Sequence, residues 1–357
     1  MLEESIDKKP IHFIVSTGRT GSTLLSTMLN AHPQIISLSE QPFTLNLIDG
    51  YINITKWNNK IKNQFIDDFF LFATDKLSTQ FSDRVTLENY FNQSAKSLSF
   101  EKAIKLSFLS FFESKVKSDI KIFVSKELIF HTQIKKITSY YPEAKFIILT
   151  RDPRDNVQIK INRALRRSEK QKTFRYIAAW NIVYKLLFKD LKKYAPENFI
   201  VLKYEDLVKS TEPTLKNICN FLDVTFHEDM LNYDHKNKLE FEERKEKIPK
   251  HLMQQLNREH QGLLIKTNTD KIGIWKREMN TELAEKIWNE CRHTAKLMGY
   301  SYSENESFNS KNKLGINYKA FRFWFYLNNI IIPKIYYKSP FVARRIFKKI
   351  RLKLNRN

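Results

Sequence analysis

The sequence predicts an α/β protein built on a parallel β-sheet with helices on both faces, followed by a basic amphipathic helical tail. Four short apolar runs, at residues 11–16, 121–125, 145–150 and 199–203, alternate with segments of helical periodicity. That alternation is typical of parallel strands joined by crossover helices. The chain has 357 residues and is long enough to bury a large core.

We expect one main domain over residues 1–310 and a tail over residues 311–357. Within the domain, residues 50–118 are rich in Phe, Asn and Lys, and Phe65, Phe69 and Phe72 follow helical spacing. This segment predicts a helical insertion between the first two strands. It could line a substrate pocket, cover the sheet, or do both.

The first apolar run is followed by a turn of small residues and then by a predicted helix whose first residues carry hydroxyl groups. The turn holds two glycines, several hydroxyls and Arg19 at the positive end of the helix dipole, which together favour an anion. A triphosphate-binding P-loop places lysine after its second glycine, but Ser22 follows Gly21 here. The loop is therefore P-loop-like and suits one 5′-phosphoryl group better than ATP. A nucleotide kinase is correspondingly disfavoured.

The residues from Arg19 to Leu25, followed by Met-Leu-Asn-Ala-His-Pro at 28–33, resemble the 5′-phosphosulfate loop of the sulfotransferases. The sequence of this loop is similar to that of the branch that contains the protein-tyrosine sulfotransferases and many bacterial enzymes. That family transfers a sulfuryl group from 3′-phosphoadenosine 5′-phosphosulfate (PAPS) to a hydroxyl or amine. The resemblance implies that the 5′-phosphate is held by Arg19, Thr20, Gly21, Ser22 and Thr23.

A second landmark follows the apolar run at 146–149, which delivers Arg151 to the carboxyl end of a predicted strand. The resemblance implies that Arg151 and Arg163, twelve positions later, grip the 3′-phosphate. Where the family usually has a serine between them, this chain has Ile159. Either Lys160 or Asn156 replaces that hydrogen bond, or the donor binds less tightly.

Sulfuryl transfer needs a base for the acceptor hydroxyl and a cation for the departing phosphate oxygen. The resemblance implies that Glu40 is the base and that Lys126 contacts the leaving group. His131 is a rival base, because other family members use a histidine soon after that lysine. Pro42 stands where the tyrosine branch has an arginine, so we do not expect a tyrosine peptide as acceptor.

Two weaker landmarks complete the resemblance. Tyr204 opens a Tyr-Glu-Asp-Leu run after the fourth apolar segment and is expected near the adenosine. Lys276 follows a glycine in a late segment similar to the loop that covers PAPS. The resemblance spans residues 11–302.

The two cysteines, Cys219 and Cys291, offer neither a disulfide framework nor a thiolate metal cluster, and the eight histidines lack close metal-ligand spacing. We expect no metal cofactor. No signal-like N-terminus or membrane-length apolar run is present, so a cytoplasmic location is expected.

The tail carries 13 Lys or Arg residues and no Asp or Glu, out of a formal net charge of +22. Within it Val342, Ile346, Ile350 and Leu354 fall four apart, with basic residues on the remaining face. Such a helix favours the surface of anionic membranes. We therefore expect a peripheral protein on the inner membrane face, with a lipid-linked or membrane-proximal acceptor. A helix packed on the protein's own core is the main alternative; a nucleic-acid patch is disfavoured because no recognition motif accompanies it.

Two functions remain open. The first is a PAPS-dependent sulfotransferase acting on a hydroxyl of a sugar, lipid or other acceptor. The second is a membrane-surface binding protein on a degenerate sulfotransferase scaffold, which Ile159 and Pro42 suggest.

Overall fold

The computed structural model describes residues 6–72, 84–94, 98–111, 119–235, 268–302 and 309–354, and the single residues 82, 238, 242 and 266. Within these residues, five strands form one parallel sheet in the order β2-β3-β1-β4-β5. They are β1 (Ile11–Val15), β2 (Ile35–Ser39), β3 (Ile122–Lys126), β4 (Phe146–Thr150) and β5 (Phe199–Lys203). The predicted α/β class is confirmed, and each of the four apolar runs forms a strand.

Strand β2 was not predicted, because Ser37 and Ser39 interrupt its apolar character. All five of its residues are nevertheless buried, and it pairs with β3 in a register that places Ser39 opposite Lys126. The helical insertion therefore lies between β2 and β3, the second and third strands, and not between the first two. As a consequence, Glu40 directly follows the carboxyl end of a strand.

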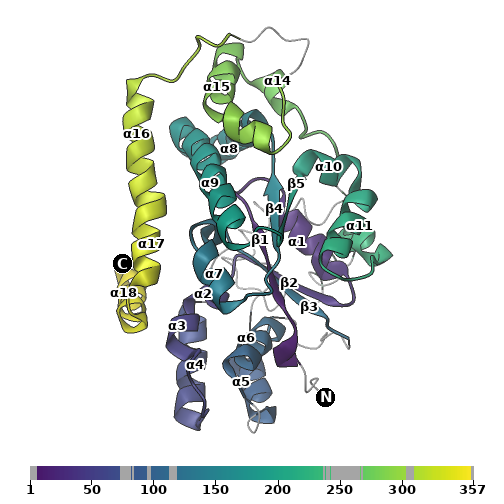
Figure 1. Ribbon diagram of the computed structural model, residues 1–357, viewed down its shortest axis with the longest axis vertical. Coiled ribbons are helices and arrows are strands. Elements are labelled where there is room, and N and C mark those ends of the chain that lie inside the picture. The colour runs from purple at the N-terminus through teal and green to yellow at the C-terminus, as the bar shows by residue number, and fades with distance from the viewer. Residues whose placement is uncertain are drawn as a thin grey trace.

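Helices cover both faces of the sheet (Figure 1). Side chains alternate along β1, so that Phe13 enters one hydrophobic cluster and Ile14 the other. The Ile14 side is covered by α1 (Ser22–Ala31), α10 (Tyr204–Lys209) and α11 (Thr211–Phe221). The Phe13 side is covered by α6 (Phe100–Leu109), α7 (Ile134–Tyr140), α8 (Pro153–Arg166), α9 (Thr173–Tyr194) and α15 (Thr281–Leu297).

The connections leaving β1 and β4 run in opposite directions, toward β2 at one edge and β5 at the other. Parallel sheets place ligands at the carboxyl ends of strands beside such a switch point. The turn after β1 and the residues after β4 meet there. The fold thus predicts one site from the loops that carry the sequence motifs.

Between β2 and β3 the described residues form α2 (Phe43–Asn46), α3 (Ile48–Tyr51), α4 (Asn59–Phe72), α5 (Arg84–Gln93) and α6, so the helical segment begins before residue 50, the predicted start of the insertion. Shorter elements are η1 (Ile6–Lys8), η3 (Leu128–Thr132), η4 (Glu228–Asn232) and α14 (Ile274–Glu278).

The tail forms α16 (Ile316–Tyr326), a π-helical turn η6 (Leu327–Ile331), α17 (Ile332–Lys338) and α18 (Phe341–Leu354), along one side of the molecule (Figure 1). Its residues Tyr318, Phe325 and Tyr337 join the main hydrophobic cluster. Among the described helices, none combines the length and apolarity needed to cross a membrane.

Candidate nucleotide-binding and catalytic site

The turn between β1 and α1 has the backbone of an anion-binding nest. Gly18, Arg19 and Gly21 all have positive φ, at 79°, 59° and 84°. Positive φ is uncommon for an arginine and marks a backbone held in a demanding conformation. Such turns direct successive N–H groups into one concavity, here at the N-terminus of α1. The Thr20 hydroxyl in this turn is buried and has no partner among the described residues.

Tyr204 connects this turn to the arginine that follows β4. A Cβ on Gly21 would lie 2.6 Å from Cδ2 of Tyr204, so the tyrosine ring rests directly on the glycine. On the ring lies the guanidinium of Arg151, whose central carbon is 4.2 Å from the ring centroid. This stack places the predicted 3′-phosphate arginine next to the predicted 5′-phosphate loop.

Arg151 itself is 3% exposed. Its carbonyl oxygen accepts a hydrogen bond of 2.9 Å from the indole of Trp180, and Nη2 donates to the carbonyl oxygen of Lys271. Its Nε is buried and unpaired within the described residues. A buried guanidinium with donors to spare is suited to a phosphate.

One face of α8 borders the phosphate turn. Asn156 Nδ2 donates to the Gly18 carbonyl at 3.0 Å, and Lys160 Nζ lies 3.5 Å from the Thr17 carbonyl. Arg163 follows one turn later on the same face, by helical spacing. Burial, and then the charge of Arg19, lower the pKa of Lys160 to about 7. Of the two suggested substitutes for the missing serine, Asn156 braces the turn, whereas Lys160 supplies a charge beside it.

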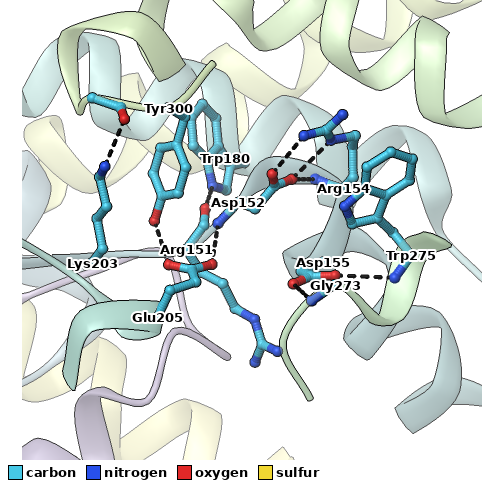
Figure 2. Close-up of polar contacts among 11 residues, drawn as sticks. Arg151, Asp152, Arg154, Asp155, Trp180, Lys203, Glu205, Gly273, Trp275 and Tyr300 are labelled. Atoms are coloured by element: carbon cyan, nitrogen blue, oxygen red, sulfur yellow. Dashed lines mark hydrogen bonds and ion pairs between the residues drawn. The ribbon is translucent and has the colours of Figure 1, made fainter. Parts of the chain in front are cut away.

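A late loop is fastened over α8 by Asp155. Its carboxylate accepts hydrogen bonds from the N–H groups of Gly273 at 2.7 Å and Trp275 at 3.0 Å (Figure 2). Burial raises the pKa of Asp155 to about 6, against the effect of the Trp275 hydrogen bond. Gly273 has a φ of +67°, which favours glycine there.

Two lysines of this late loop, Lys271 and Lys276, have different neighbours. The exposed Lys276 has its ammonium 5.5 Å from the centroid of the Trp275 ring. Lys271 is an exposed residue as well, but partial burial of its ammonium group and then the charges of Arg151, Arg166 and Arg19 lower its pKa. Lys271 thus belongs to the cationic group around Arg151, a role that the sequence analysis gave only to Lys276.

Glu205 holds the backbone beneath Arg151 in place. One of its carboxylate oxygens accepts from the Asp152 N–H at 3.0 Å, and the other accepts from the Tyr300 hydroxyl at 2.8 Å (Figure 2). Asp152 in turn caps α8 by accepting from the Arg154 N–H at 2.8 Å. These contacts fix the backbone on either side of Arg151.

The two predicted catalytic residues lie in contact with each other. Lys126 ends β3 and is 3% exposed, and its ammonium pairs with the Glu40 carboxylate. Its Nζ also lies 3.5 Å from the Thr23 hydroxyl in the first turn of α1. Burial lowers the pKa of Lys126 to about 8, with Glu127 opposing and Arg19 adding to the shift. Glu40 has a φ of +64°, so this carboxylate is also held by a demanding backbone.

The rival base, His131, faces other neighbours. It lies in η3, and its ring contacts the carbonyl of Leu128. Burial, against the effect of the Leu128 hydrogen bond and with a smaller contribution from the charge of Lys334 in the tail helix α17, lowers its pKa to about 4. The ring of His131 thus contacts the backbone of its own turn, whereas Glu40 pairs with Lys126 beside the first turn of α1. The geometry therefore favours Glu40 over His131.

The structure thus brings together the phosphate turn, Glu40, Lys126, Arg151 and Tyr204. Arg163 lies further along α8, and Lys276 lies over Trp275. Sequence reasoning missed the roles of Asp155 and Lys271, although Asp155 follows Arg151 by four residues and Lys271 precedes Gly273 by two. Among the described residues no group of three or more His, Cys, Asp or Glu side chains could hold a metal ion.

The chain aligns with several solved structures. The sulfotransferase domain of the Synechococcus PCC 7002 olefin synthase aligns with a TM-score of 0.51 and 20% identity, over 82% of this chain and 96% of that one. The sulfotransferase domain from the curacin biosynthetic pathway gives a TM-score of 0.47 and 16% identity, over 83% and 99%. A retinol dehydratase in complex with androsterone and the inactive cofactor PAP gives 0.40 and 16%, over 84% and 85%.

At 20% identity, the match to the olefin synthase domain shows the fold alone. No curated protein matches the sequence. The model of the sulfotransferase family matches residues 10–228, more than half of the chain, including the phosphate turn, Glu40, Lys126, Arg151 and Tyr204. This chain therefore belongs to the sulfotransferase family.

Proposed function

We propose that the protein transfers the sulfuryl group of PAPS to a hydroxyl of an acceptor, with Glu40 as base and Lys126 at the leaving oxygen. The observation that carries the proposal is the contact between Lys126, Glu40 and the first turn of α1. The proposed base and the proposed leaving-group cation are in contact there, beside the turn at residues 18–23. Family membership supports the reaction class.

The donor nucleotide has a phosphate at each end of its ribose, and the site has a cationic group for each. The 5′-phosphate would lie on the N–H groups of the turn at 18–23, with the N-terminus of α1 behind it. The 3′-phosphate would take the spare donors of Arg151, with Arg163 and Lys271 contributing positive charge. Tyr204 would place its ring between the two phosphate sites.

In the reaction, the acceptor oxygen attacks sulfur as its proton passes to the Glu40 carboxylate. The bond between sulfur and the bridging oxygen breaks, and its electron pair stays on the phosphate of adenosine 3′,5′-bisphosphate. Lys126 stabilises that developing charge. The Lys126–Glu40 ion pair therefore has to open when the donor arrives, which leaves the carboxylate available to the acceptor.

The test is release of adenosine 3′,5′-bisphosphate from PAPS, measured by chromatography with sugar, lipid and small-alcohol acceptors in turn. We expect Glu40→Gln to lower kcat by about 10²- to 10⁴-fold, the usual value of a general base. Donor affinity should change little. His131→Asn is the matched control and should keep its activity.

Equal losses in Glu40→Gln and His131→Asn would contradict the assignment of the base. Tight nucleotide binding without turnover on any acceptor would instead favour the degenerate scaffold. That scaffold was suggested by Ile159 and Pro42.

A further inference from the structure

The C-terminal helices leave an unusual amount of apolar surface uncovered. Of the 17 large hydrophobic residues that are exposed among the described residues, 11 lie between Ile316 and Leu354. Five of them are on α18, where their exposed fractions run from 52% to 70%: Val342, Ile346, Phe347, Ile350 and Leu354. Exposed apolar surface concentrated in this way marks an interaction site.

The apolar side of α18 is exposed because the helix packs through its other side. Arg344 is fully buried and pairs with Asp49 of α3, and Arg345 pairs with Asp68 of α4 at 2.5 Å. Phe341 rests on Gly50, where a Cβ would come within 2.6 Å of its ring. These contacts fix the rotation of α18 about its axis.

Helix geometry then determines what faces outward. At about 100° per residue, Ile346 and Ile350 lie about 40° apart and opposite the face that carries Phe341, Arg344 and Arg345. The stripe that would be buried in an ordinary amphipathic helix points away from the protein. Arg351 and Lys353 are both exposed; Lys353 lies about 20° from Ile346, beside the stripe, and Arg351 lies about 100° from Ile350.

The helices before α18 add to the same kind of surface. On α16, Phe323 is 67% exposed and Trp324 is 50% exposed, while Tyr318 and Phe325 of the same helix are buried in the core. On α17, Ile332 and Ile335 are 54% and 61% exposed. Tryptophan with aliphatic neighbours is typical of side chains at a membrane–water interface. The tail therefore combines an inner side that holds it to the domain with an uncovered apolar outer side.

The charge of the tail indicates which partner covers its apolar outer side. The tail has 13 basic residues and no acidic ones, and the remainder of the chain is also basic, since the whole carries +22. A second copy would bring two strongly positive surfaces together. Anionic lipid headgroups supply the opposite charge, and the acyl region receives the apolar side chains. We propose that the outer face of α16–α18 binds the surface of an anionic bilayer without crossing it, with Ile346 and Ile350 entering the acyl boundary.

The experiment is vesicle flotation of the full chain with two kinds of vesicle. One kind contains equal parts of phosphatidylglycerol and phosphatidylcholine, and the other contains phosphatidylcholine alone. We expect the protein to float with the anionic vesicles and to stay behind with the neutral ones. Recovery unbound from both, or equal binding to both, overturns the proposal.

Two pairs of variants separate the apolar and the electrostatic contributions. Ile346→Ser/Ile350→Ser should abolish flotation, whereas Val85→Ser/Leu297→Ser, at sites that are 60% and 62% exposed, should leave it unchanged. Arg351→Glu/Lys353→Glu should weaken binding at least about 25-fold, at about fivefold for each basic side chain. Lys209→Glu/Lys296→Glu makes the same change in net charge elsewhere on the surface and should have a much smaller effect.

Circular dichroism of each variant confirms that it is folded, which the exposed positions favour. If Ile346→Ser/Ile350→Ser binds anionic vesicles like the wild type, the stripe is not the membrane contact. If that variant instead converts a dimer to a monomer in sedimentation velocity, the stripe is a contact between copies. Either result overturns the proposal. Flotation needs neither donor nor acceptor, so its result does not depend on the proposed enzymatic activity.

Discussion

Replacing Gly21 by alanine should damage the site through two separate costs. The residue has a φ of +84°, and an alanine in this left-handed region costs about 1–2 kcal/mol. The new Cβ would also lie 2.6 Å from Cδ2 of Tyr204, and overpacking of this kind costs about 1–3 kcal/mol. We therefore expect Gly21→Ala to lower the free energy of unfolding by about 2–5 kcal/mol.

Gly18 provides the matched control in the same turn. Its φ is +79°, but the nearest atom to a Cβ there is Leu128 Cδ1 at 3.6 Å, an ordinary contact. Gly18→Ala should therefore cost only the backbone strain of about 1–2 kcal/mol. Urea unfolding followed by circular dichroism measures both variants. Tyr204→Leu combined with Gly21→Ala should recover part of the additional loss, because the ring is then absent.

Equal destabilisation by Gly18→Ala and Gly21→Ala would refute the reasoning, because the ring contact would then have no energetic consequence. A displaced Tyr204 should also weaken nucleotide binding, because Arg151 loses the ring on which it lies.

Three further predictions concern the donor site. The affinity for adenosine 3′,5′-bisphosphate should fall as the pH rises through about 7, because the pKa of Lys160 in the unliganded protein lies there and only its protonated form attracts phosphate. Titration calorimetry across pH should show a flatter affinity profile in Lys160→Met. An unchanged profile would show that Lys160 does not contribute to phosphate binding. Ile159→Ser should tighten nucleotide binding about three- to tenfold by adding one hydrogen bond, and no gain in the calorimeter would mean that the position does not face the 3′-phosphate. Asp155→Asn should weaken nucleotide binding about tenfold or more, because the N–H groups of Gly273 and Trp275 donate to different carboxylate oxygens and asparagine replaces one of these oxygens by an NH2 donor; unaltered affinity would show that this loop does not contribute to binding.

The positions of those candidate-site residues that lie in short local motifs could be predicted from the sequence. Arg151 and Lys126 each follow or end an apolar run, and the carboxyl ends of parallel strands meet at one edge of a sheet. The phosphate turn is likewise contained in one short segment. Strand β2 escaped notice because two serines interrupt it, yet that strand is what places Glu40 beside Lys126.

Contacts between distant segments were beyond sequence reasoning. The ring of Tyr204 lies on Gly21, and Asp155 fastens a loop 118 residues away in the chain. The four-residue spacing in the tail predicted an amphipathic helix, but not which side faces the protein. That depends on Asp49, which pairs with Arg344 across 295 residues. Electrostatic pairing reversed the orientation that hydrophobicity alone would give.

The central claim is that this site holds a nucleotide phosphorylated at both ends, as PAPS donation requires. Its most direct test is titration calorimetry with adenosine 3′,5′-bisphosphate and with adenosine 5′-monophosphate, on the wild type and on Arg151→Ala. We expect the bisphosphate to bind the wild type at least about tenfold more tightly, because a charge-assisted phosphate contact is lost in the monophosphate. Arg151→Ala should remove that preference. No binding of either nucleotide, or a preference that survives in Arg151→Ala, would contradict the account.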